Sequence, residues 1–259
     1  MTSEVAAATR VFRDAGVPSP EYDARALAAH AAMTGADFEA LVARRAAREP
    51  LQHLLGTAAF RYLELAVGPG VFVPRPETEV LVEAVLHVVD DTSIVVDLCA
   101  GSGAIGLSVA HERPGTRVHL VERDPVAFEW LQRNAAGFDD VHLHLGDIAE
   151  ALHDLDGRVD VVASNPPYVA EHERALVDPE VRDHDPEAAL FAGTDGMDVI
   201  RVVATRAWEL LKPGGFVAIE HSGRQGNAVP DLLRSNGWVD VEDHDDLTGR
   251  PRFTTGRKP

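Results

Sequence analysis

The chain has 259 residues, of which 45% are hydrophobic and 25% are charged; these fractions are typical of folded proteins and exclude a disordered or fibrous class. Its 24 Lys and Arg residues are outnumbered by 42 Asp and Glu residues, and the net charge of −18 argues against a surface that follows a nucleic-acid backbone. The single cysteine, Cys99, excludes an internal disulfide and a Cys-based zinc site, and the longest stretch without a charged residue, Leu98 to His111, is too short to span a membrane. We therefore expect a cytoplasmic protein.

The first part of the chain predicts a small helical domain over residues 1–55. It is rich in alanine, and proline and glycine residues divide it into two or three short helices, the last covering Phe38 to Arg48. Residues 56–73 alternate between apolar and polar side chains and then turn at Gly68-Pro69-Gly70. This pattern predicts a β-hairpin that links two domains.

Residues 74–259 alternate between apolar strand-like runs and helical segments. Strands are expected at Ile94–Leu98, Arg117–Val121, Val141–Leu145, Val159–Ala163 and Phe216–Ile219. Helices fit around them at Glu79–Val88, Ile105–Glu112, Pro125–Ala135 and Met197–Leu211. Several strand runs are apolar on both faces, as in a buried parallel sheet, so we predict a doubly wound α/β domain.

A glycine-rich loop follows the first of these strands and opens a helix. Gly101, Gly103 and Gly106 satisfy the pattern G-x-G-x-x-G, which lets the backbone turn tightly and present helix N–H groups to a ligand. The next strand ends at Glu122, whose carboxylate can accept hydrogen bonds from both hydroxyls of a ribose. By itself the loop does not distinguish a dinucleotide from S-adenosylmethionine, and close helix–strand packing is the plainer interpretation of its glycines.

Two carboxylates favour S-adenosylmethionine. Asp97 lies at the strand end, where a negative charge would repel a phosphate but help to place a positively charged methionine group. Asp147 ends the third strand and can accept a hydrogen bond from the adenine amine, while Ile148 can cover the ring. A helix N-cap is the plainer interpretation of Asp147.

The motif Asn165-Pro166-Pro167-Tyr168 directly follows the predicted strand Val159–Ala163 and its Ser164. Two consecutive prolines cannot continue a central strand, and they leave the Pro166 carbonyl as a free acceptor. The Asn165 side chain supplies a second acceptor, so the two can hold both hydrogens of a planar –NH2 group on which Tyr168 can stack. An amide nitrogen is a poor nucleophile, and these hydrogen bonds orient its lone pair and stabilise the charge that develops on methylation. A plain Pro-Pro turn is the alternative.

With these motifs, the sequence resembles the HemK-type release factor glutamine methyltransferases over most of its length. The resemblance extends to REPLQHLLG at 48–56, VFVPRPETEVLV at 71–82, VRDHDPEAALFAGTDGMDVI at 181–200, LKPGGFVAIEHSGRQG at 211–226 and TGRPRF at 248–253. It implies a class I S-adenosylmethionine-dependent methyltransferase: a doubly wound sheet of seven strands, the last antiparallel, preceded by a small helical domain. It also implies methylation of the glutamine side-chain amide in the Gly-Gly-Gln loop of peptide chain release factors.

The resemblance also assigns the site residues. It places the methyl donor against Cys99, Ala100, Gly101, Ser102, Gly103, Glu122, Asp147, Ile148 and Asn165, in addition to Asp97 above. It places the substrate glutamine against Asn165, Pro166, Pro167 and Tyr168, with catalytic roles for Asn165, Pro166 and Tyr168. In the matching family segment that closes over the site, Arg75 and Glu77 are expected to order one another or the substrate loop. The chain departs from the family at Cys99, where glycine is common, at Ile148, where an aromatic residue is common, and in a shorter N-terminal region.

Several other functions are compatible with parts of the sequence. A glutamine methyltransferase acting on a ribosomal protein would share every catalytic residue, and a DNA or RNA amino-methyltransferase uses a similar Asn-Pro-Pro-aromatic turn. The net charge and the lack of a basic cluster beyond ARRAAR at 43–48 disfavour nucleic acid as a direct partner. A nicotinamide-dependent oxidoreductase leaves the Asn-Pro-Pro-Tyr motif unexplained, and intact site residues disfavour an inactive binding protein. The histidine spacing predicts no metal site. We expect a monomer that acts on release factors and binds no membrane.

Overall fold

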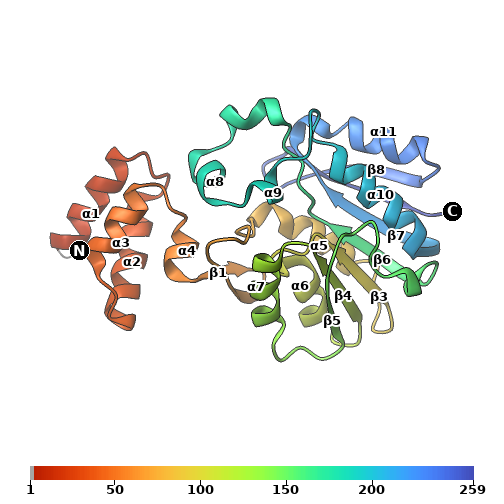
Figure 1. Cartoon of the computed structure of the whole chain (residues 1–259), viewed down its shortest axis with the longest axis horizontal. Coiled ribbons are helices and arrows are strands. Elements are labelled where there is room, and N and C mark those ends of the chain that lie inside the picture. The colour runs from red at the N-terminus through yellow and green to blue at the C-terminus, as the bar shows by residue number, and fades with distance from the viewer. Residues whose placement is uncertain (1–2) are drawn as a thin grey trace.

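The N-terminal helices form a lobe at one end of the molecule (Figure 1). The computed structural model describes residues 3–259, and this lobe contains α1 (Ser3–Asp14), α2 (Pro20–Thr34), α3 (Phe38–Ala46) and α4 (Leu51–Leu55). Buried apolar side chains, among them Phe12 and Leu27, give the lobe a hydrophobic core of its own. Gly35 and Gly56 end α2 and α4 in the left-handed conformation with φ of +77°, which glycine adopts without steric cost.

A short β-hairpin follows the lobe, but it turns earlier than predicted. Strands β1 (Thr57–Phe60) and β2 (Leu63–Ala66) pair antiparallel, with Phe60 opposite Leu63. The hairpin therefore reverses at Arg61 and Tyr62. The predicted turn at Gly68-Pro69-Gly70 is also present, because the Val71 N–H donates to the Gly68 carbonyl at 3.3 Å and Gly70 has φ +91°, but this turn follows the hairpin and does not connect its strands. Arg61 adopts φ +48° and is held by hydrogen bonds to Glu112 at 2.5 and 2.8 Å.

The glycines at 68 and 70 serve close packing. A Cβ atom on Gly68 would lie 2.5 Å from the Trp130 side chain, and one on Gly70 would lie 2.5 Å from Val126. Trp130 and Val126 belong to helix α7 (Pro125–Ala135). The segment after β2 therefore lies directly against this helix, and the glycines serve both this contact and the turn at 68–71.

The C-terminal part of the chain is built on one large sheet. Within residues 3–259, seven strands lie in the order β5-β4-β3-β6-β7-β9-β8. Their bounds are β3 (Ile94–Leu98), β4 (Arg117–Glu122), β5 (Val141–Leu145), β6 (Val159–Ser164), β7 (Leu211–Glu220), β8 (Val239–Asp245) and β9 (Pro251–Arg257). Strand β9 runs antiparallel to both β7 and β8, whereas β3 to β7 pair in parallel. This confirms the doubly wound, seven-stranded mixed sheet.

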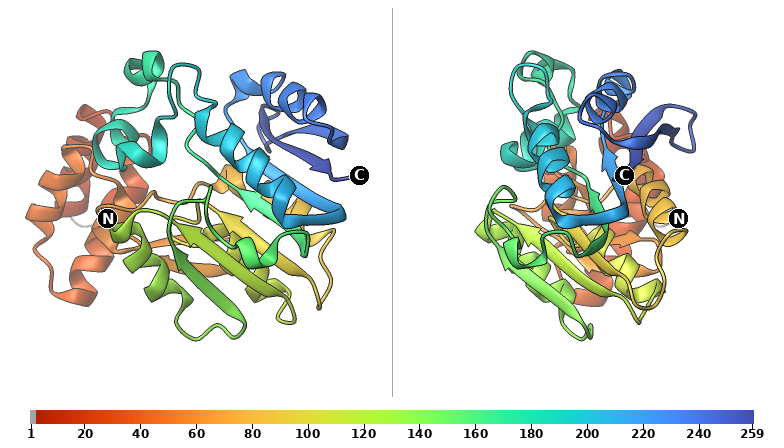
Figure 2. Two further views of the ribbon diagram at one scale, coloured as in Figure 1. Left: turned by 45° about the vertical axis from the view of Figure 1, so that its right-hand side comes forward. Right: turned by 90° about the vertical axis from the view of Figure 1, so that its right-hand side faces the viewer.

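Helices cover both faces of the sheet (Figure 2). One face packs against α5 (Glu79–Leu86), α6 (Ala104–Glu112) and α7. The other packs against α10 (Asp198–Leu210) and α11 (Ala228–Ser235). The alternation along β3 shows the two layers, because Val95 belongs to the first hydrophobic cluster and Val96 to the second.

The remaining elements are short and were not predicted individually. They are the 3-10 helices η1 (Pro76–Thr78), η2 (His153–Leu155), η3 (Glu171–Leu176) and η4 (Gly223–Gln225), and the helices α8 (Pro179–His184) and α9 (Glu187–Leu190). The last two strands were also missed by the residue pattern, since the edge strand β8 carries mostly exposed acidic side chains. Among the described residues, no helix has the length and apolar character needed to cross a membrane.

The order of the strands creates a switch point between β3 and β6. From β3 the chain adds β4 and β5 on one side of the sheet, and it then returns to add β6 and β7 on the other. At such a point the connections leave the sheet in opposite directions, and a crevice opens beyond the carboxyl ends of the strands. The glycine-rich loop follows β3 and the Asn-Pro-Pro-Tyr motif follows β6, so both lie at this crevice.

Candidate active site

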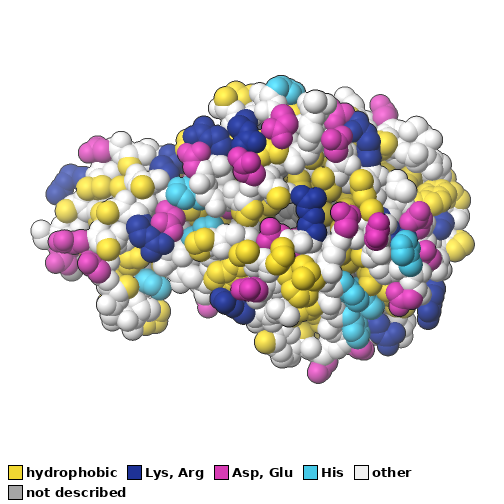
Figure 3. Space-filling model, viewed as in Figure 1, with side chains coloured by type: hydrophobic (Ala, Val, Ile, Leu, Met, Phe, Trp, Pro, Cys, Tyr) yellow, Lys and Arg dark blue, Asp and Glu magenta, His cyan; other side chains and the backbone are white. Residues whose placement is uncertain are grey.

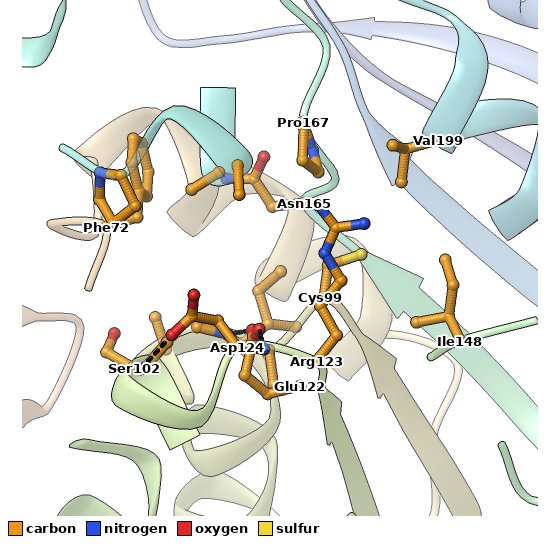
Figure 4. A pocket seen from close by; sticks show the side chains of 18 of the residues that line it. Phe72, Cys99, Ser102, Glu122, Arg123, Asp124, Ile148, Asn165, Pro167 and Val199 are labelled. Atoms are coloured by element: carbon orange, nitrogen blue, oxygen red, sulfur yellow. Dashed lines mark hydrogen bonds between the residues drawn. The ribbon is translucent and has the colours of Figure 1, made fainter. Parts of the chain in front are cut away.

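A cavity of about 260 Å³ occupies the crevice. Its lining includes residues from the loops after β3, β4, β5 and β6, together with segments 70–78 and 186–202. In Figure 4, Ser102, Glu122 and Asp124 lie on one side of the pocket and Asn165 and Pro167 on the other. The cavity thus joins the two motifs that the sequence singled out.

The glycine-rich loop uses its glycines in different ways. A Cβ atom on Gly103 would lie 2.7 Å from the Leu107 and Leu131 side chains, and one on Gly106 would lie 2.7 Å from Leu120. These two glycines therefore permit close packing. Gly101 has φ +55°, and a Cβ atom there would meet no described atom within 4 Å, because this part of the loop faces the open cavity.

Cys99, where the family commonly has glycine, takes a conformation that suits glycine. Its φ of +66° lies in the left-handed region, and the residue lines the cavity together with Ala100, Gly101 and Ser102. Burial raises the pKa of the Cys99 thiol above its usual range, and the charges of Glu122 and Asp97 raise it further. The thiol therefore stays protonated, which argues against a nucleophilic role.

Glu122 is tied to the loops on both sides of it. One carboxylate oxygen accepts a hydrogen bond from the Gly101 N–H at 2.9 Å, and the other accepts one from the Asp124 N–H at 2.8 Å. The side chain lines the cavity although it is only 8% exposed. Each oxygen keeps a lone pair free, so a carboxylate fixed in this way can still accept hydrogen bonds from a ligand.

Asp97 lies below the cavity and is not among the residues that line it. Its Oδ2 accepts a hydrogen bond from the Gly106 N–H at 2.9 Å, whereas its buried Oδ1 has no partner within the described structure. Burial raises the pKa of Asp97 to about 7; the Gly106 hydrogen bond opposes this shift and the charge of Glu122 adds to it. An unpartnered buried carboxylate oxygen suits a nearby positive ligand, but in this conformation the side chain is buried and does not line the cavity.

Asp147 and Ile148 both line the pocket, and Ile148 lies at its right-hand side in Figure 4. The Asp147 Oδ1 accepts a hydrogen bond from the Ala149 N–H at 2.9 Å within a turn. Among the described residues no helix begins at this turn, so the interpretation of Asp147 as a helix N-cap is wrong. Ile148 is 7% exposed and presents an apolar surface to the cavity. Arg123 lines the same region, where its guanidinium extends upward toward Asn165 in the view of Figure 4.

Asn165 connects the cavity to a set of buried polar groups. Its Nδ2 donates a hydrogen bond to the Thr78 hydroxyl at 3.3 Å, and Thr78 donates to Glu220 at 2.6 Å. The Tyr168 hydroxyl donates to the other oxygen of Glu220 at 3.2 Å. Asn165 and Thr78 line the cavity, whereas Glu220 is 1% exposed and lies behind them.

The rest of the Asn-Pro-Pro-Tyr motif is only partly at the cavity. Pro167 lines it, whereas Pro166 and Tyr168 are not among its lining residues. The Tyr168 ring packs against the hydrophobic cluster between the sheet and α10. Burial raises the pKa of Tyr168 above its usual range, and the neighbouring Glu220 charge raises it further. In this conformation the ring supports the motif from behind and does not face the cavity.

Arg75 binds a partner that the sequence did not indicate. Its guanidinium donates to the buried Asp185 carboxylate at 2.7 Å and lies 5.1 Å from the centre of the Phe72 ring. The resemblance predicts that Arg75 and Glu77 order one another or the substrate loop. In the structure Arg75 pairs with Asp185. This ion pair fixes the segment that follows the Asn-Pro-Pro-Tyr motif. Burial raises the pKa of Asp185 to about 6, although the Arg75 charge opposes the shift.

The same segment is tied to the N-terminal lobe. Glu180 of α8 pairs with Arg45 at 2.8 Å, and Asp178 pairs with Arg48 at 3.0 Å. Further along, Pro186, Ala188 and Ala189 form part of the cavity wall. Three arginines therefore hold residues 178–185, and with them the start of a wall of the cavity. We call residues 178–190 the wall segment.

Several lining residues escaped the sequence reasoning, among them Phe72, Thr78, Arg123, Asp124 and Val199. Asp124 could have been found, because it precedes a proline at the start of a helix and its Oδ1 accepts hydrogen bonds from the Val126 and Ala127 N–H groups. Arg123 belongs to no motif that would single it out, and Thr78 lies in the segment 71–82 that carries the resemblance but received no role there.

The donor side of the cavity fits S-adenosylmethionine. Glu122 offers acceptors for ribose hydroxyls, Ile148 offers an apolar surface for the adenine ring, and the open face at Gly101 leaves space that a side chain would fill. The carboxylates of Asp97 and Asp147 suit a positively charged ligand better than a phosphate. The chemistry of the lining residues is therefore that of a sulfonium donor site.

Comparison with known proteins gives one consistent family. The profile of the methyltransferase small domain matches residues 63–180. A release factor glutamine methyltransferase of Streptomyces coelicolor is 52% identical, over 100% of this chain and 98% of the relative. One of Mycolicibacterium smegmatis is 45% identical, again over 100% and 98%. A solved methyltransferase from Pyrococcus furiosus shares the fold, with a TM-score of 0.56 and 19% identity over 76% of this chain and 89% of that one.

Proposed function

We propose that this chain, which belongs to the release factor glutamine methyltransferase family, methylates the glutamine side-chain amide in the Gly-Gly-Gln loop of peptide chain release factors. S-adenosylmethionine is the methyl donor. The observation that carries the proposal is the position of the Asn165 amide, which lines the same cavity as the glycine-rich loop. A single cavity therefore contains the donor loop and an acceptor suited to a planar –NH2 group.

The donor-binding residues of the proposal are Asp97, Asp147, Ile148, Glu122 and the loop from Cys99 to Gly103. Glu122 accepts hydrogen bonds from the ribose, and the Gly101 and Asp124 N–H groups hold its carboxylate in place. Asp147 and Ile148 flank the adenine. Asp97 acts through the field of its carboxylate, because the residue does not line the cavity.

The chemistry at the substrate amide requires orientation and no strong base. When bound, S-adenosylmethionine supplies a methyl group made electrophilic by the positive sulfonium. The Asn165 Oδ1 and the Pro166 carbonyl accept one amide hydrogen each, which turns the nitrogen lone pair toward the donor side of the cavity. The same acceptors stabilise the positive charge that develops on the nitrogen, and the proton leaves after transfer.

The remaining site residues hold this arrangement. Pro167 forms a rigid part of the cavity wall. Tyr168 is proposed to stack on the substrate amide, which requires its ring to turn toward the cavity when the substrate binds. Arg75 fixes the wall segment through Asp185, and Glu77 lies on the same short helix as Thr78. These residues shape the opening through which the substrate loop enters.

The N-terminal domain, residues 1–55, is proposed to dock the body of the protein substrate, joined through the linker 56–73 to the catalytic domain 74–259. Its own hydrophobic core and its ion pairs to the wall segment support this role. On the face shown in Figure 3, basic side chains are scattered among acidic ones, which favours a protein partner over nucleic acid. A monomer suffices, because one chain supplies all the lining residues named above.

The proposal is tested by methyl transfer from tritiated S-adenosylmethionine. The acceptors are a release factor and its variant with alanine in place of the Gly-Gly-Gln glutamine, each incubated with the purified enzyme. Label on the first and none on the second is expected. Equal label on both would contradict the assignment of the target residue, and label on neither would contradict the proposed substrate.

A further inference from the structure

The Asn165 amide is the end of a hydrogen-bonded series that leads into the protein interior. Thr78 and Glu220 are 3% and 1% exposed, so neither exchanges its partners with solvent. Thr78 and Glu220 are 142 residues apart in the sequence, so only the tertiary structure brings them together, from η1 and from the end of β7. The mechanism above uses neither residue.

The direction of each hydrogen bond follows from simple chemistry. A threonine hydroxyl has one proton to donate, and an ionised carboxylate can only accept. At 2.6 Å the Thr78 proton is therefore committed to Glu220, and toward Asn165 the Thr78 oxygen can only accept. The group of Asn165 that faces Thr78 must then be its NH2, which leaves Oδ1 as the group free for the cavity.

This direction matters because an asparagine amide has two similar ends. If it rotated by half a turn, it would present NH2 to the substrate amide, which also carries NH2, and the two would repel. We propose, on the basis of the function proposed above, that Thr78 and Glu220 are positioning residues that fix the Asn165 amide with its oxygen toward the substrate. They act through Asn165 and touch neither the donor nor the reacting nitrogen.

Groups from several elements set the charge of Glu220. The Tyr168 hydroxyl donates to it, Arg252 of β9 faces it with a positive charge, and Glu77 of η1 opposes it with a negative one. Burial raises the pKa of Glu220 to about 7, and the Thr78 hydrogen bond and the Arg252 charge limit this shift. Once protonated, Glu220 can donate to Thr78, and the constraint on Asn165 is lost. Turnover should therefore fall as pH decreases through the pKa of Glu220.

The first test removes the Thr78 hydroxyl without changing the shape of the side chain. In Thr78→Val, kcat for a release factor should fall about 10- to 100-fold, while the affinity for S-adenosylmethionine measured by calorimetry stays unchanged. Thr78→Ser restores the hydroxyl and should recover most of the activity. Thr116→Val is the matched control, because Thr116 is 1% exposed, bonds only locally to Arg113 at 2.8 Å, and lies at the opposite end of the strands.

The second test uses pH, because a merely structural role would not change the pH profile. Glu220→Gln keeps an acceptor for Thr78 but cannot titrate, so the ratio of wild-type kcat to variant kcat should increase from about pH 6 to about pH 8. The comparison with wild type is needed because Asp97 has a raised pKa in the same range and contributes to both profiles.

The outcomes separate this inference from the proposed function. If wild type labels the release factor and Thr78→Val does so equally fast, or if Thr78→Val loses donor affinity in step with kcat, the positioning role is overturned. A wild-type to Glu220→Gln ratio that does not change with pH would also overturn it. If wild type itself does not label the release factor, the proposed function fails first.

Discussion

The donor half and the acceptor half of the cavity are built in different ways. In the donor half, the contacts that fix the carboxylates are local: Glu122 binds the Asp124 N–H two residues away and the Gly101 N–H 21 residues away. Asp147 binds the Ala149 N–H, again two residues away. Backbone N–H groups of turns and helix starts supply most of these hydrogen bonds, so the donor half is largely completed within one βαβ unit.

The acceptor half depends on contacts between distant segments. Asn165 and Thr78 are 87 residues apart, Thr78 and Glu220 are 142 apart, and Arg75 and Asp185 are 110 apart. Side chains make these contacts, and the complete tertiary structure is needed to align them. We therefore expect the donor half to tolerate changes elsewhere in the chain, and the acceptor half to be sensitive to any loosening of the segments that meet there.

The substitution Asn165→Ala should separate the two halves most clearly. It removes one preorganised acceptor, so kcat should fall about 10²–10³-fold. The affinity for S-adenosylmethionine, measured by calorimetry, should barely change, because the carboxylates of the donor half are untouched. Asn236→Ala removes an amide that bonds to Leu232 at the end of α11 and serves as the control. Turnover by Asn165→Ala equal to that of the control would contradict the acceptor role.

The substitution Arg45→Met tests how strongly the acceptor half depends on the N-terminal lobe. Arg45 is 3% exposed and pairs with Asp23 and with Glu180 of the wall segment, both at 2.8 Å. Removing it leaves the buried Asp23 without its ion-pair partner and leaves Glu180 with Arg48 alone, at 3.7 Å, so the free energy of unfolding should fall by about 3 kcal/mol, as measured by denaturant titration.

The control for this prediction is Arg13→Met, which breaks an ion pair with Glu21 that is more than half exposed on the arginine side. It should cost about 0–1 kcal/mol. Because Glu180 lies on the wall segment, Arg45→Met should also lower kcat without changing donor affinity. A loss of donor affinity as large as the loss of kcat would show that the two halves are not separable in this way.

The substitution Glu122→Ala is the converse test in the donor half. It removes the acceptor for the ribose hydroxyls, and a loss of about 2 kcal/mol, or roughly 30-fold in affinity for S-adenosylmethionine, is expected. At saturating donor, kcat should change far less than in Asn165→Ala. Glu129→Ala, on the exposed face of α7, is the control. Unchanged donor affinity in Glu122→Ala would disprove the ribose assignment.

Deletion of residues 1–50 should have the smallest effect on the rate of the methyl-transfer step. If the N-terminal lobe docks the substrate protein, methylation of an intact release factor should decrease more than methylation of a short peptide from its loop, as rates on the two substrates will show. The deletion also removes Arg45 and Arg48, which hold the wall segment. Equal losses on both substrates would therefore assign the lobe to support of the cavity wall and not to docking.

More of the proposed donor half than of the proposed acceptor half could be singled out from the sequence, for the same physical reason. The spacing of Gly101, Gly103 and Glu122 is a local pattern. In the structure Gly101 and Glu122 line the cavity and are hydrogen-bonded to each other, and Gly103 lies in the same loop as Gly101. Asn165 was also found, because Pro166 and Pro167 make its strand end unusual. Thr78 and Glu220 lie in segments that carry the resemblance, at 71–82 and 211–226, but nothing local indicates their role, since that role exists only when η1 meets the end of β7.

The errors have identifiable causes as well. The hairpin was expected to reverse at Gly68-Pro69-Gly70, but its strands are connected at Arg61 and Tyr62, and the turn at 68–71 follows them. A turn signal in a sequence does not say which two segments the turn connects. Arg75 was assigned no partner outside its own segment, and its pair with Asp185 could not be seen without the tertiary structure.

The most direct measurement of the central claim is a competition in one reaction. Tritiated S-adenosylmethionine and the enzyme are mixed with equal amounts of a release factor, ribosomal proteins and ribosomal RNA, and the label is located after separation. The account predicts label on the release factor, on the side-chain amide of its Gly-Gly-Gln glutamine. Label on a ribosomal protein or on RNA in preference to the release factor would contradict it.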